Sequence, residues 1–371
     1  MSRIFFDYST MSRFQGHPTG IPRTVEELAV AFEEVAPQAV FVALRGNDRG
    51  FRAFDRRSRE FGAVVEFARG DRLFSPSAGW AYGHYNEEVS KLVSSGVRYS
   101  QLYYDLIPSL FPYFYKDFKF GDFFSKWTTA NLCLCSTAFA ISECTKRDTI
   151  DLCAGGRRDI PFHVVRLGDV IPSASASGRE GSASAREGCA GVDIKGRFAL
   201  SVGTLEYRKN QVVLLNAYRA LLSANFKNLP HLVLVGREGW MNNHLAYQVA
   251  TDPLLKGYVT VLSDVSDAGL DYLYRNCIFT LFPALYEGWG LPVAESLKYG
   301  KPCVTSNISS MPEIAPTLTR FADPLNLTEW VRHISELSGD EYQLQAESAR
   351  IAKTYKPVLW TETALKILSH L

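Results

Sequence analysis

The chain has 371 residues, with 40 Lys and Arg against 39 Asp and Glu. A single hydrophobic core rarely grows beyond about 250–300 residues, so this length favours two domains. Hydrophobic residues make up 46% and charged residues 21%, which excludes a disordered chain. The net charge of +1 gives no overall positive field, so nucleic acid is not expected as a partner.

The sequence contains no candidate membrane span. Its longest apolar run is the six residues from Ala39 to Leu44, whereas a membrane helix needs about 18–20. The amino-terminal stretch MSRIFFDYST lacks the features of a signal peptide. Seven cysteines without a Cys-x-x-Cys arrangement favour buried thiols in a reducing compartment. We therefore expect a cytoplasmic protein.

A segment of unusual composition divides the chain. Residues 173–191 read SASASGREGSASAREGCAG, in which fourteen of nineteen residues are Ser, Ala or Gly. Such a segment cannot bury enough apolar surface to offset its ordering entropy, which favours a flexible linker over a regulatory or docking segment. We predict a first domain over 1–172, a linker over 173–195 and a second domain over 196–350. For the helix within 351–371, both a return to the first domain and another surface position remain open.

Alternating strand and helix patterns precede the linker. One amphipathic helix is predicted over Pro22–Glu34, with Pro in its first turn. The predicted strands of this half are Arg3–Asp7, Ala39–Leu44, Gln101–Asp105, Leu132–Cys135 and Phe162–Leu167.

The alternation is more regular after the linker. Strands are predicted over Phe198–Val202, His231–Val235, Val259–Leu262, Ile278–Phe282 and Pro302–Thr305. Helices are predicted over Gln211–Leu222, Gly269–Asn276, Pro292–Tyr299 and Trp360–Leu371. Such alternation is typical of a parallel sheet with helices on both faces, so we expect an α/β fold with two doubly wound halves.

The loop after Phe198–Val202 carries adjacent cations. It reads GTLEYRKN over 203–210 and leads directly into a helix. Ligands of parallel sheets bind beyond the carboxyl ends of the strands, so Arg208 and Lys209 are placed to clamp a phosphate. A solvated cation pair in a turn is the alternative. Neither GxGxxG nor GxxxxGK[ST] occurs, which argues against a standard dinucleotide fold or a P-loop enzyme.

A second loop, after Ile278–Phe282, combines glycines with two carboxylates. It reads PALYEGWGLPVAE over 283–295. Gly288 and Gly290 allow the backbone to approach a ligand, and the start of the following helix favours a phosphate. Glu287 and Glu295 would repel that phosphate unless they accept hydrogen bonds from hydroxyl groups, for which a sugar is the obvious source. The alternative is that these acids only complement the helix dipole.

These motifs resemble those of retaining glycosyltransferases with the GT-B fold, family 4 of the carbohydrate-active enzymes. The stretch EGWGLPVAESLKYGKPCVTSN resembles the family signature, with seven residues between Glu287 and Glu295, and SVGTLEYRKN is similar to its phosphate loop. In the first half, TGIPRTVEEL, YYDLIPSLFP, FAISECTKRD and VVRLGDVIP also fit. The resemblance implies two Rossmann-like domains that face each other across a cleft.

The resemblance also implies roles for individual residues. Arg208 and Lys209 would hold the donor diphosphate, Glu295 would accept from ribose hydroxyls, and Glu287 would accept from the transferred sugar. Further donor-binding positions are Gly203, Thr204, Asn210, Gly288, Trp289, Gly290, Leu291, Gly16 and Gly20. Asp105 would act on the acceptor side, although this chain has Tyr104 where relatives often have His.

The expected reaction is hexosyl transfer from a nucleotide sugar. No carboxylate is placed as a covalent nucleophile, so we expect same-face attack with retention. Asp-x-Asp is absent, and we expect neither a metal nor another cofactor, because the cation pair can replace a metal. The YYDLIP motif most resembles that of family members that use GDP-mannose or related deoxyhexose donors, and this resemblance implies GDP-mannose as the first expected donor, with rhamnose or another deoxyhexose second. The alternatives are a non-catalytic nucleotide-sugar-binding module and a GT-B epimerase or phosphorylase.

The acceptor is expected to be a glycan or a lipid-linked saccharide in bacterial surface polysaccharide or lipopolysaccharide assembly. Residues 103–127 hold eleven aromatics in twenty-five positions, and residues 45–59 hold six arginines. Core packing and solvated arginines explain these features most simply. The other interpretation is a face that contacts an anionic membrane from its cytoplasmic side.

Overall fold

The computed structural model describes residues 2–15, 20–46, 48–115, 117–153, 160–169, 196–239, 241 and 244–371. The predicted linker 173–195 and Gly16 lie outside these ranges. The chain divides into two compact units. Unit 1 comprises Met1–Pro112, Asp117–Gly168 and Val358–Leu371, and unit 2 comprises Tyr113–Lys116 and Asp169–Pro357. The predicted segment 351–371 is therefore divided between the units after Pro357.

Unit 1 is built on a sheet with the order β4-β3-β2-β1-β5-β6-β7-β8. The strands are β1 (Ile4–Asp7), β2 (Val40–Ala43), β3 (Arg52–Asp55), β4 (Glu60–Val64), β5 (Arg72–Ser75), β6 (Arg98–Tyr103), β7 (Thr137–Ala140) and β8 (Phe162–Val164). The six strands β2, β1, β5, β6, β7 and β8 pair in parallel with their neighbours in this order. Strands β3 and β4 form an antiparallel extension beside β2, at one edge of the sheet. The predicted parallel sheet is thus confirmed for six of these strands, and the antiparallel pair β3 and β4 was not predicted.

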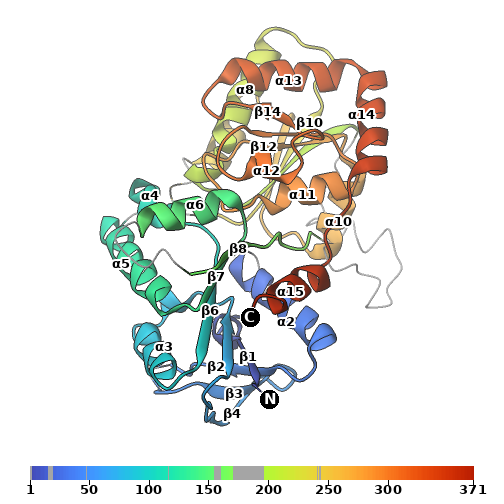
Figure 1. Ribbon diagram of the computed structural model, residues 1–371. Helices are drawn as coiled ribbons and strands as arrows, with labels where there is room; N and C mark the ends of the chain where they lie inside the picture. The colour runs from blue at the N-terminus through green and yellow to red at the C-terminus, as the bar shows by residue number, and fades with distance from the viewer. Residues whose placement is uncertain are drawn as a thin grey trace. The chain divides into compact units, whose positions relative to one another are not determined.

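Helices cover both faces of this sheet (Figure 1). They are α1 (Ser9–Ser12), α2 (Ile21–Val35), α3 (Tyr85–Ser94), α4 (Ile107–Leu110), α5 (Phe118–Leu134), α6 (Glu143–Leu152) and α15 (Trp360–Leu368). The carboxyl-terminal helix α15 packs against α2. The Trp360 ring also lies against Gly168, so close that a Cβ on this glycine would be 2.5 Å from the ring.

The strand predicted over Leu132–Cys135 is wrong, because this stretch ends helix α5. The helix starts at Asp117, whose side chain accepts a hydrogen bond from the Lys119 N–H at 2.9 Å. Its buried positions include Phe124, Trp127, Thr128, Asn131 and Leu132, a spacing that follows one helical face. A four-residue apolar run has no period of its own, so it cannot distinguish a strand from the end of a buried helix.

Unit 2 contains a parallel sheet with the order β11-β10-β9-β12-β13-β14. Its strands are β9 (Phe198–Val202), β10 (His231–Val235), β11 (Val259–Leu262), β12 (Phe279–Phe282), β13 (Cys303–Ser306) and β14 (Arg320–Ala322). Its helices are α8 (Gln211–Ser223), α9 (Leu245–Thr251), α10 (Asp267–Asn276), α11 (Leu291–Lys298), α12 (Met311–Ile314), α13 (Leu327–Gly339) and α14 (Glu341–Thr354). The predicted elements of this half are confirmed with end shifts of one or two residues, apart from the last helix, which lies in unit 1.

Strand β9 lies between β10 and β12, so the chain turns to opposite sides of β9 as it builds the sheet. Ligands of open α/β sheets bind at such a switch point, beyond the carboxyl ends of the strands. Close backbone packing marks this edge: a Cβ on Gly236, after β10, would lie 2.0 Å from the Gly203 carbonyl oxygen. The loops after β9 and β12 therefore meet where a ligand site is expected.

No helix in the described ranges is long and apolar enough to cross a membrane.

Candidate functional site

The loop between β9 and α8 presents Arg208 and Lys209. A short 3-10 turn, Tyr207–Lys209, ends at Asn210, whose left-handed backbone (φ 54°) starts α8. Asparagine tolerates this conformation better than most residues. Its side-chain amide donates to the carbonyl oxygens of Pro324 at 2.8 Å and Pro283 at 3.2 Å. Asn210 thus fixes the angle at which the cation pair leaves the loop.

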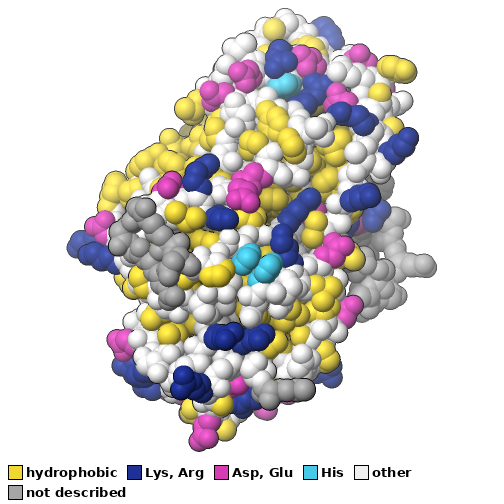
Figure 2. Space-filling model, in the orientation of Figure 1, with side chains coloured by type: hydrophobic (Ala, Val, Ile, Leu, Met, Phe, Trp, Pro, Cys, Tyr) yellow, Lys and Arg dark blue, Asp and Glu magenta, His cyan; other side chains and the backbone are white. Residues whose placement is uncertain are grey.

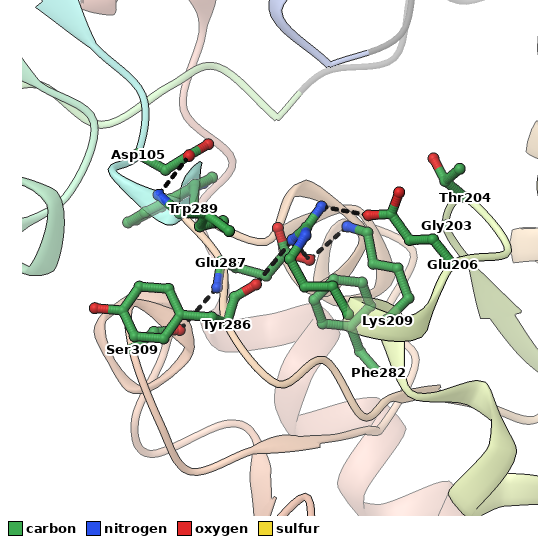
Figure 3. A network of polar contacts seen from close by, with 12 residues as sticks. Asp105, Gly203, Thr204, Glu206, Lys209, Phe282, Tyr286, Glu287, Trp289 and Ser309 are labelled. Atoms are coloured by element: carbon green, nitrogen blue, oxygen red, sulfur yellow. Dashed lines mark hydrogen bonds and ion pairs between the residues drawn. The ribbon is translucent and has the colours of Figure 1, made fainter. Parts of the chain in front are cut away.

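Both cations contact Glu287, which lies in the loop after β12. Figure 3 shows the Lys209 side chain directed toward Glu287. The Arg208 guanidinium lies 2.8 Å from the Glu287 carboxylate, and the Lys209 ammonium donates to the same carboxylate oxygen. Arg208 also donates to Glu206 at 2.7 Å and to the Tyr286 carbonyl oxygen at 2.8 Å. The structure therefore brings together three of the four predicted catalytic residues, Arg208, Lys209 and Glu287.

This ion cluster is largely removed from water. The exposed fractions of the side chains are 17% for Arg208, 13% for Lys209 and 11% for Glu287. Burial alone would raise the pKa of Glu287, but the charges of Arg208 and Lys209 outweigh it and hold that pKa below its ordinary value. Glu287 is therefore ionised at neutral pH and can act as a hydrogen-bond acceptor.

The backbone around Glu287 is held by two serines that sequence reasoning missed. The Glu287 N–H donates to Ser309 Oγ at 3.1 Å, and Ser310 Oγ donates to the carbonyl oxygens of Glu287 (3.0 Å) and Trp289 (2.8 Å). Both serines follow β13, and this position beyond a strand end was the available signal. They fix the turn that aims the Glu287 side chain at the cations.

The turn then enters helix α11 through Gly290. Its φ of 106° places it in the region that favours glycine, and Leu291 and Pro292 open the helix. Trp289 is buried beside it. This arrangement places the start of α11 directly after β12, at the carboxyl edge of the sheet, and its role in binding an anion stays a prediction.

Glu295 is more deeply buried than the sequence suggests, with an exposed fraction of 2%. Its carboxylate accepts a hydrogen bond from the Tyr274 hydroxyl at 2.9 Å. Burial, and then the Glu295 charge, raise the pKa of Tyr274, so this hydroxyl remains a donor. The Tyr274 ring stacks on Tyr299 with centroids 5.3 Å apart. The role of Glu295 toward a ribose stays a prediction.

The remaining predicted donor positions of unit 2 lie on the same edge. The Gly203 N–H extends the ladder to the Val235 carbonyl oxygen at 2.9 Å, and Gln211 on α8 donates to the Thr204 carbonyl oxygen at 3.0 Å. Figure 3 shows Gly203 and Thr204 beside Glu206 and Lys209. Glu206, which sequence reasoning did not select, is thus a structural partner of the cation pair.

Within the described ranges, two of the predicted site residues, Gly20 and Asp105, belong to unit 1. Gly20 has a φ of 59° and immediately precedes α2, and nothing lies within 4 Å of a Cβ built on it. Asp105 follows β6 and accepts a hydrogen bond from the Ile107 N–H at 3.0 Å. The neighbouring Tyr104 is buried and donates its hydroxyl to the Pro76 carbonyl oxygen at 2.7 Å. The tyrosine is therefore part of the packing of unit 1.

The arginine-rich stretch 45–59 is partly neutralised within unit 1. Arg56 is paired with Glu26 (2.7 Å) and Glu33 (2.8 Å), and Arg49 with Glu87 (2.6 Å). On the face that Figure 2 shows, basic and acidic side chains are interspersed. The simpler interpretation of this stretch, structural and solvated arginines, therefore accounts for several of its members.

In the described part of the chain, no group of three or more His, Cys, Asp or Glu is arranged to hold a metal ion.

Residues 191–355 match the family Glycosyl transferases group 1. A stretch of 163 residues is 34% identical to O-antigen chain mannosyltransferase B of Escherichia coli, covering 44% of this chain and 42% of that protein. A stretch of 169 residues is 25% identical to the serotype-specific mannosyltransferase WbdA of Escherichia coli, covering 45% of this chain and 20% of WbdA. These matches thus span less than half of the length of the curated relatives.

Solved structures extend the likeness to the whole chain. Sucrose-phosphate synthase from Thermosynechococcus elongatus has a TM-score of 0.70 at 13% identity, covering 100% of this chain and 98% of that one. Anabaena HepE, in complex with UDP and glucose, has a TM-score of 0.67 at 14% identity, with both chains fully covered. WaaG, a glycosyltransferase involved in lipopolysaccharide biosynthesis, has a TM-score of 0.65 at 14% identity and covers 98% of this chain and 99% of its own. The chain has the GT-B fold, as predicted.

Proposed function

We propose that this protein is a retaining glycosyltransferase of family 4 that transfers a hexose from a nucleotide sugar without a metal. The observation that carries the proposal is the buried cluster of Arg208, Lys209 and Glu287 at the switch point of a group 1 glycosyl transferase domain. Two cations beside one carboxylate suit a donor that has both a diphosphate and sugar hydroxyls. At a site for a phosphate alone, Glu287 would hold the two cations in place but would repel the ligand.

The chemistry follows from this charge arrangement. The bond between the sugar C1 and the diphosphate oxygen breaks, and the acceptor oxygen bonds to C1 on the same face. The acceptor proton passes to the departing diphosphate. Arg208 and Lys209 stabilise the negative charge that grows on the leaving group, which is the largest contribution in catalysis of this kind. Their positions are fixed before the donor binds, since Glu206 and Glu287 already hold them.

We propose mannose from GDP-mannose as the transferred group, with rhamnose or another deoxyhexose second. This choice is supported by the likeness of parts of this chain to mannosyltransferases of Escherichia coli and to O-antigen chain mannosyltransferase RfbU of Salmonella typhimurium, 28% identical over 93 residues. The bound UDP in the HepE structure belongs to a relative of 14% identity, so it does not decide the base.

The acceptor would be a glycan or a lipid-linked saccharide of a surface polysaccharide. The names of the O-antigen relatives and of WaaG support this class of product. A lipid-linked acceptor would be reached from the cytoplasmic face of a membrane, where the protein would act as a peripheral protein. Flotation with anionic vesicles at low salt tests this part, and failure to float contradicts it.

Nucleotide release tests the main proposal. The protein is incubated with GDP-mannose, UDP-glucose and a dTDP-linked deoxyhexose, with and without EDTA, and free nucleotide is measured. We expect release from GDP-mannose that EDTA does not reduce and that an Arg208→Ala, Lys209→Ala double variant loses. Saturable binding without turnover would favour a non-catalytic module, and a changed sugar on an intact nucleotide would favour an epimerase.

A further inference from the structure

Unit 1 contains a cavity of about 470 Å³ that the proposed donor chemistry does not use. Its lining residues are Met11, Ser12, Arg13, Phe14, Gln15 and Arg59. The volume falls in the range of small-molecule sites, about 300–1,000 Å³. The lining is polar at four of its six residues and includes two guanidinium groups, which favours an anion.

The cavity lies where unit 1 is expected to bind a ligand. Met11 and Ser12 belong to α1, which begins just beyond the carboxyl end of β1, and residues 13–15 follow this helix. Arg59 lies in the turn between β3 and β4 and reaches the same place through its side chain. Strand β1 has β2 on one side and β5 on the other, so the connections leave β1 in opposite directions, as they leave β9 in unit 2. This is the switch point of the first sheet. Unit 1 therefore has its own cationic site, on a different sheet from Arg208 and Lys209.

Arg59, which lines this site, has an unfavourable backbone conformation. Its φ is 60°, a left-handed backbone that costs most residues roughly 1–2 kcal/mol and that Gly or Asn would adopt more easily. Its guanidinium Nη2 donates to the carbonyl oxygens of Met11 at 3.0 Å and Phe14 at 2.9 Å. The side chain is thereby fixed at the cavity wall, with its remaining N–H groups available to a ligand.

Arg13 is fixed on the other part of the wall. Its guanidinium carbon lies 4.3 Å from the centroid of the Tyr82 ring, and Tyr82 is anchored by a hydrogen bond to the Ser9 carbonyl oxygen at 2.6 Å. In the described ranges, neither Arg13 nor Arg59 has a carboxylate within ion-pair distance, whereas Arg49, Arg52 and Arg56 do. Two preoriented guanidinium groups without a carboxylate partner match the oxygens of a phosphate.

We propose that this cavity is an anion site that binds a phosphate group of the acceptor. The identification of this ligand as the acceptor rests on the proposed glycosyltransferase function. In that function Arg208 and Lys209 bind the donor diphosphate, so a second phosphate site is left for the acceptor. The phosphate could belong to a phosphorylated saccharide or to the diphosphate of a lipid carrier. Both present the same chemistry to the arginines.

The four methionines of the chain make a direct test possible, since methyl NMR can observe each one. Met11 lines the cavity, and Met311 is buried beside Ser309, whose hydroxyl lies 3.4 Å from its sulfur. The two methyl signals, assigned with Met11→Leu and Met311→Leu variants, report separately on the two sites. Full-length protein labelled at the methionine methyl groups is titrated with inorganic phosphate, mannose 1-phosphate, farnesyl diphosphate and GDP.

We expect inorganic phosphate, and at least one of mannose 1-phosphate and farnesyl diphosphate, to shift the methyl signal of Met11. Of the last two compounds, the one that binds more tightly identifies the source of the phosphate. Arg13→Gln and Arg59→Gln should each weaken this binding at least tenfold, whereas Arg57→Gln, from the same hairpin but outside the cavity, should not. Because Arg59 also holds the 11–14 backbone, Arg13→Gln is the decisive variant. No shift of Met11, or a shift that survives Arg13→Gln, overturns the proposal. GDP should shift the methyl signal of Met311 but not that of Met11. If GDP shifts the Met11 signal alone, the cavity serves the donor, and the proposal is overturned. Failure of GDP to shift Met311 would instead count against the proposed function.

Discussion

The guanidinium of Arg208 lies 2.8 Å from the carboxylate of Glu287, which joins the loops after β9 and β12. The Leu285 N–H donates to the Arg208 carbonyl oxygen at 2.8 Å, so the backbones of the two loops are joined as well. The arginine is therefore held in place by its own domain before any ligand binds. Both the activity and the stability of this domain should therefore depend on the contact between Arg208 and Glu287.

Replacement of Arg208 by Gln should lower turnover about 10²–10³-fold, because one preoriented donor to the leaving group is lost. Lys209 remains to neutralise Glu287, so the fold should persist. The measurement is nucleotide release under saturating donor. Arg219→Gln is the control, since Arg219 forms a comparable ion pair with Asp252 (2.6 Å) on the same domain. Equal turnover of the two variants would contradict the role of Arg208.

Glu287→Gln should lower the free energy of unfolding by roughly 3–5 kcal/mol, because two buried cations lose the carboxylate that they share. Addition of GDP should recover part of this loss, since its phosphates supply negative charge to the folded state only. Urea unfolding with and without GDP measures both effects. Glu341→Gln is the control: its pair with Arg197 is exposed, and such pairs contribute about 0–1 kcal/mol.

The pH dependence of this stability has a definite sign. The pKa of Glu287 in the folded protein lies below its ordinary value of 4.5, so the unfolded state binds a proton first as the solution is acidified. The stabilisation by Glu287 is complete above pH 4.5 and is lost as the pH falls through the folded pKa. The difference between wild type and Glu287→Gln should therefore shrink below pH 4.5. A constant difference down to the acid transition would refute this explanation.

Glu295→Gln should weaken the binding of GDP but not of 2′,3′-dideoxy-GDP, if the carboxylate accepts from ribose hydroxyls. A hydrogen bond to a charged group is worth about 1.5–3 kcal/mol, so the loss should be roughly tenfold or more. Tyr274→Phe should have a smaller effect of the same kind, since it removes the hydroxyl that orients Glu295 but keeps the stack on Tyr299. Calorimetric titration of each variant with both nucleotides measures these losses of affinity. Equal losses for both would place Glu295 away from the ribose.

Mild acid should loosen the docking of α15 in unit 1. The rings of His163 and His370 are stacked with centroids 3.8 Å apart. Burial, then His370, Lys146 and Lys366, lower the pKa of His163 below its ordinary value of 6.5. The unfolded state therefore binds more protons below pH 6.5, and stability falls as the pH falls.

Melting temperatures between pH 7.5 and 5.5 test this effect. In a unit of this size, 1 kcal/mol corresponds to roughly 2–4 °C. The decrease on acidification should be smaller in His370→Gln and in Lys366→Gln, because each removes a positive charge that faces His163 in acid. A decrease of the same size in all three proteins would show that the stacked pair does not cause it.

The sequence by itself determined the α/β class, strands β9 to β13 and helices α8, α10 and α11 of unit 2, and the identity of the cation pair. These features depend on local patterns, namely apolar strands of four or five residues, amphipathic helices, and glycine- and proline-rich turns between them. The carboxyl ends of parallel strands share one edge of a sheet, so the position of Arg208, Lys209 and Glu287 after their strands already indicated a common site.

Only the tertiary structure decided which groups complete that site. Glu206, Ser309 and Ser310 have no distinctive pattern, and their contacts with Arg208 and Glu287 depend on how the loops pack. The same holds for the end of α5, where burial rather than local sequence selected the helix, and for Arg59. Arg13 and Arg59 lie far apart in the chain, and the cavity that they line exists only because the β3–β4 hairpin folds against the segment after β1. Side-chain partners across loops arise from packing, which local sequence patterns do not record.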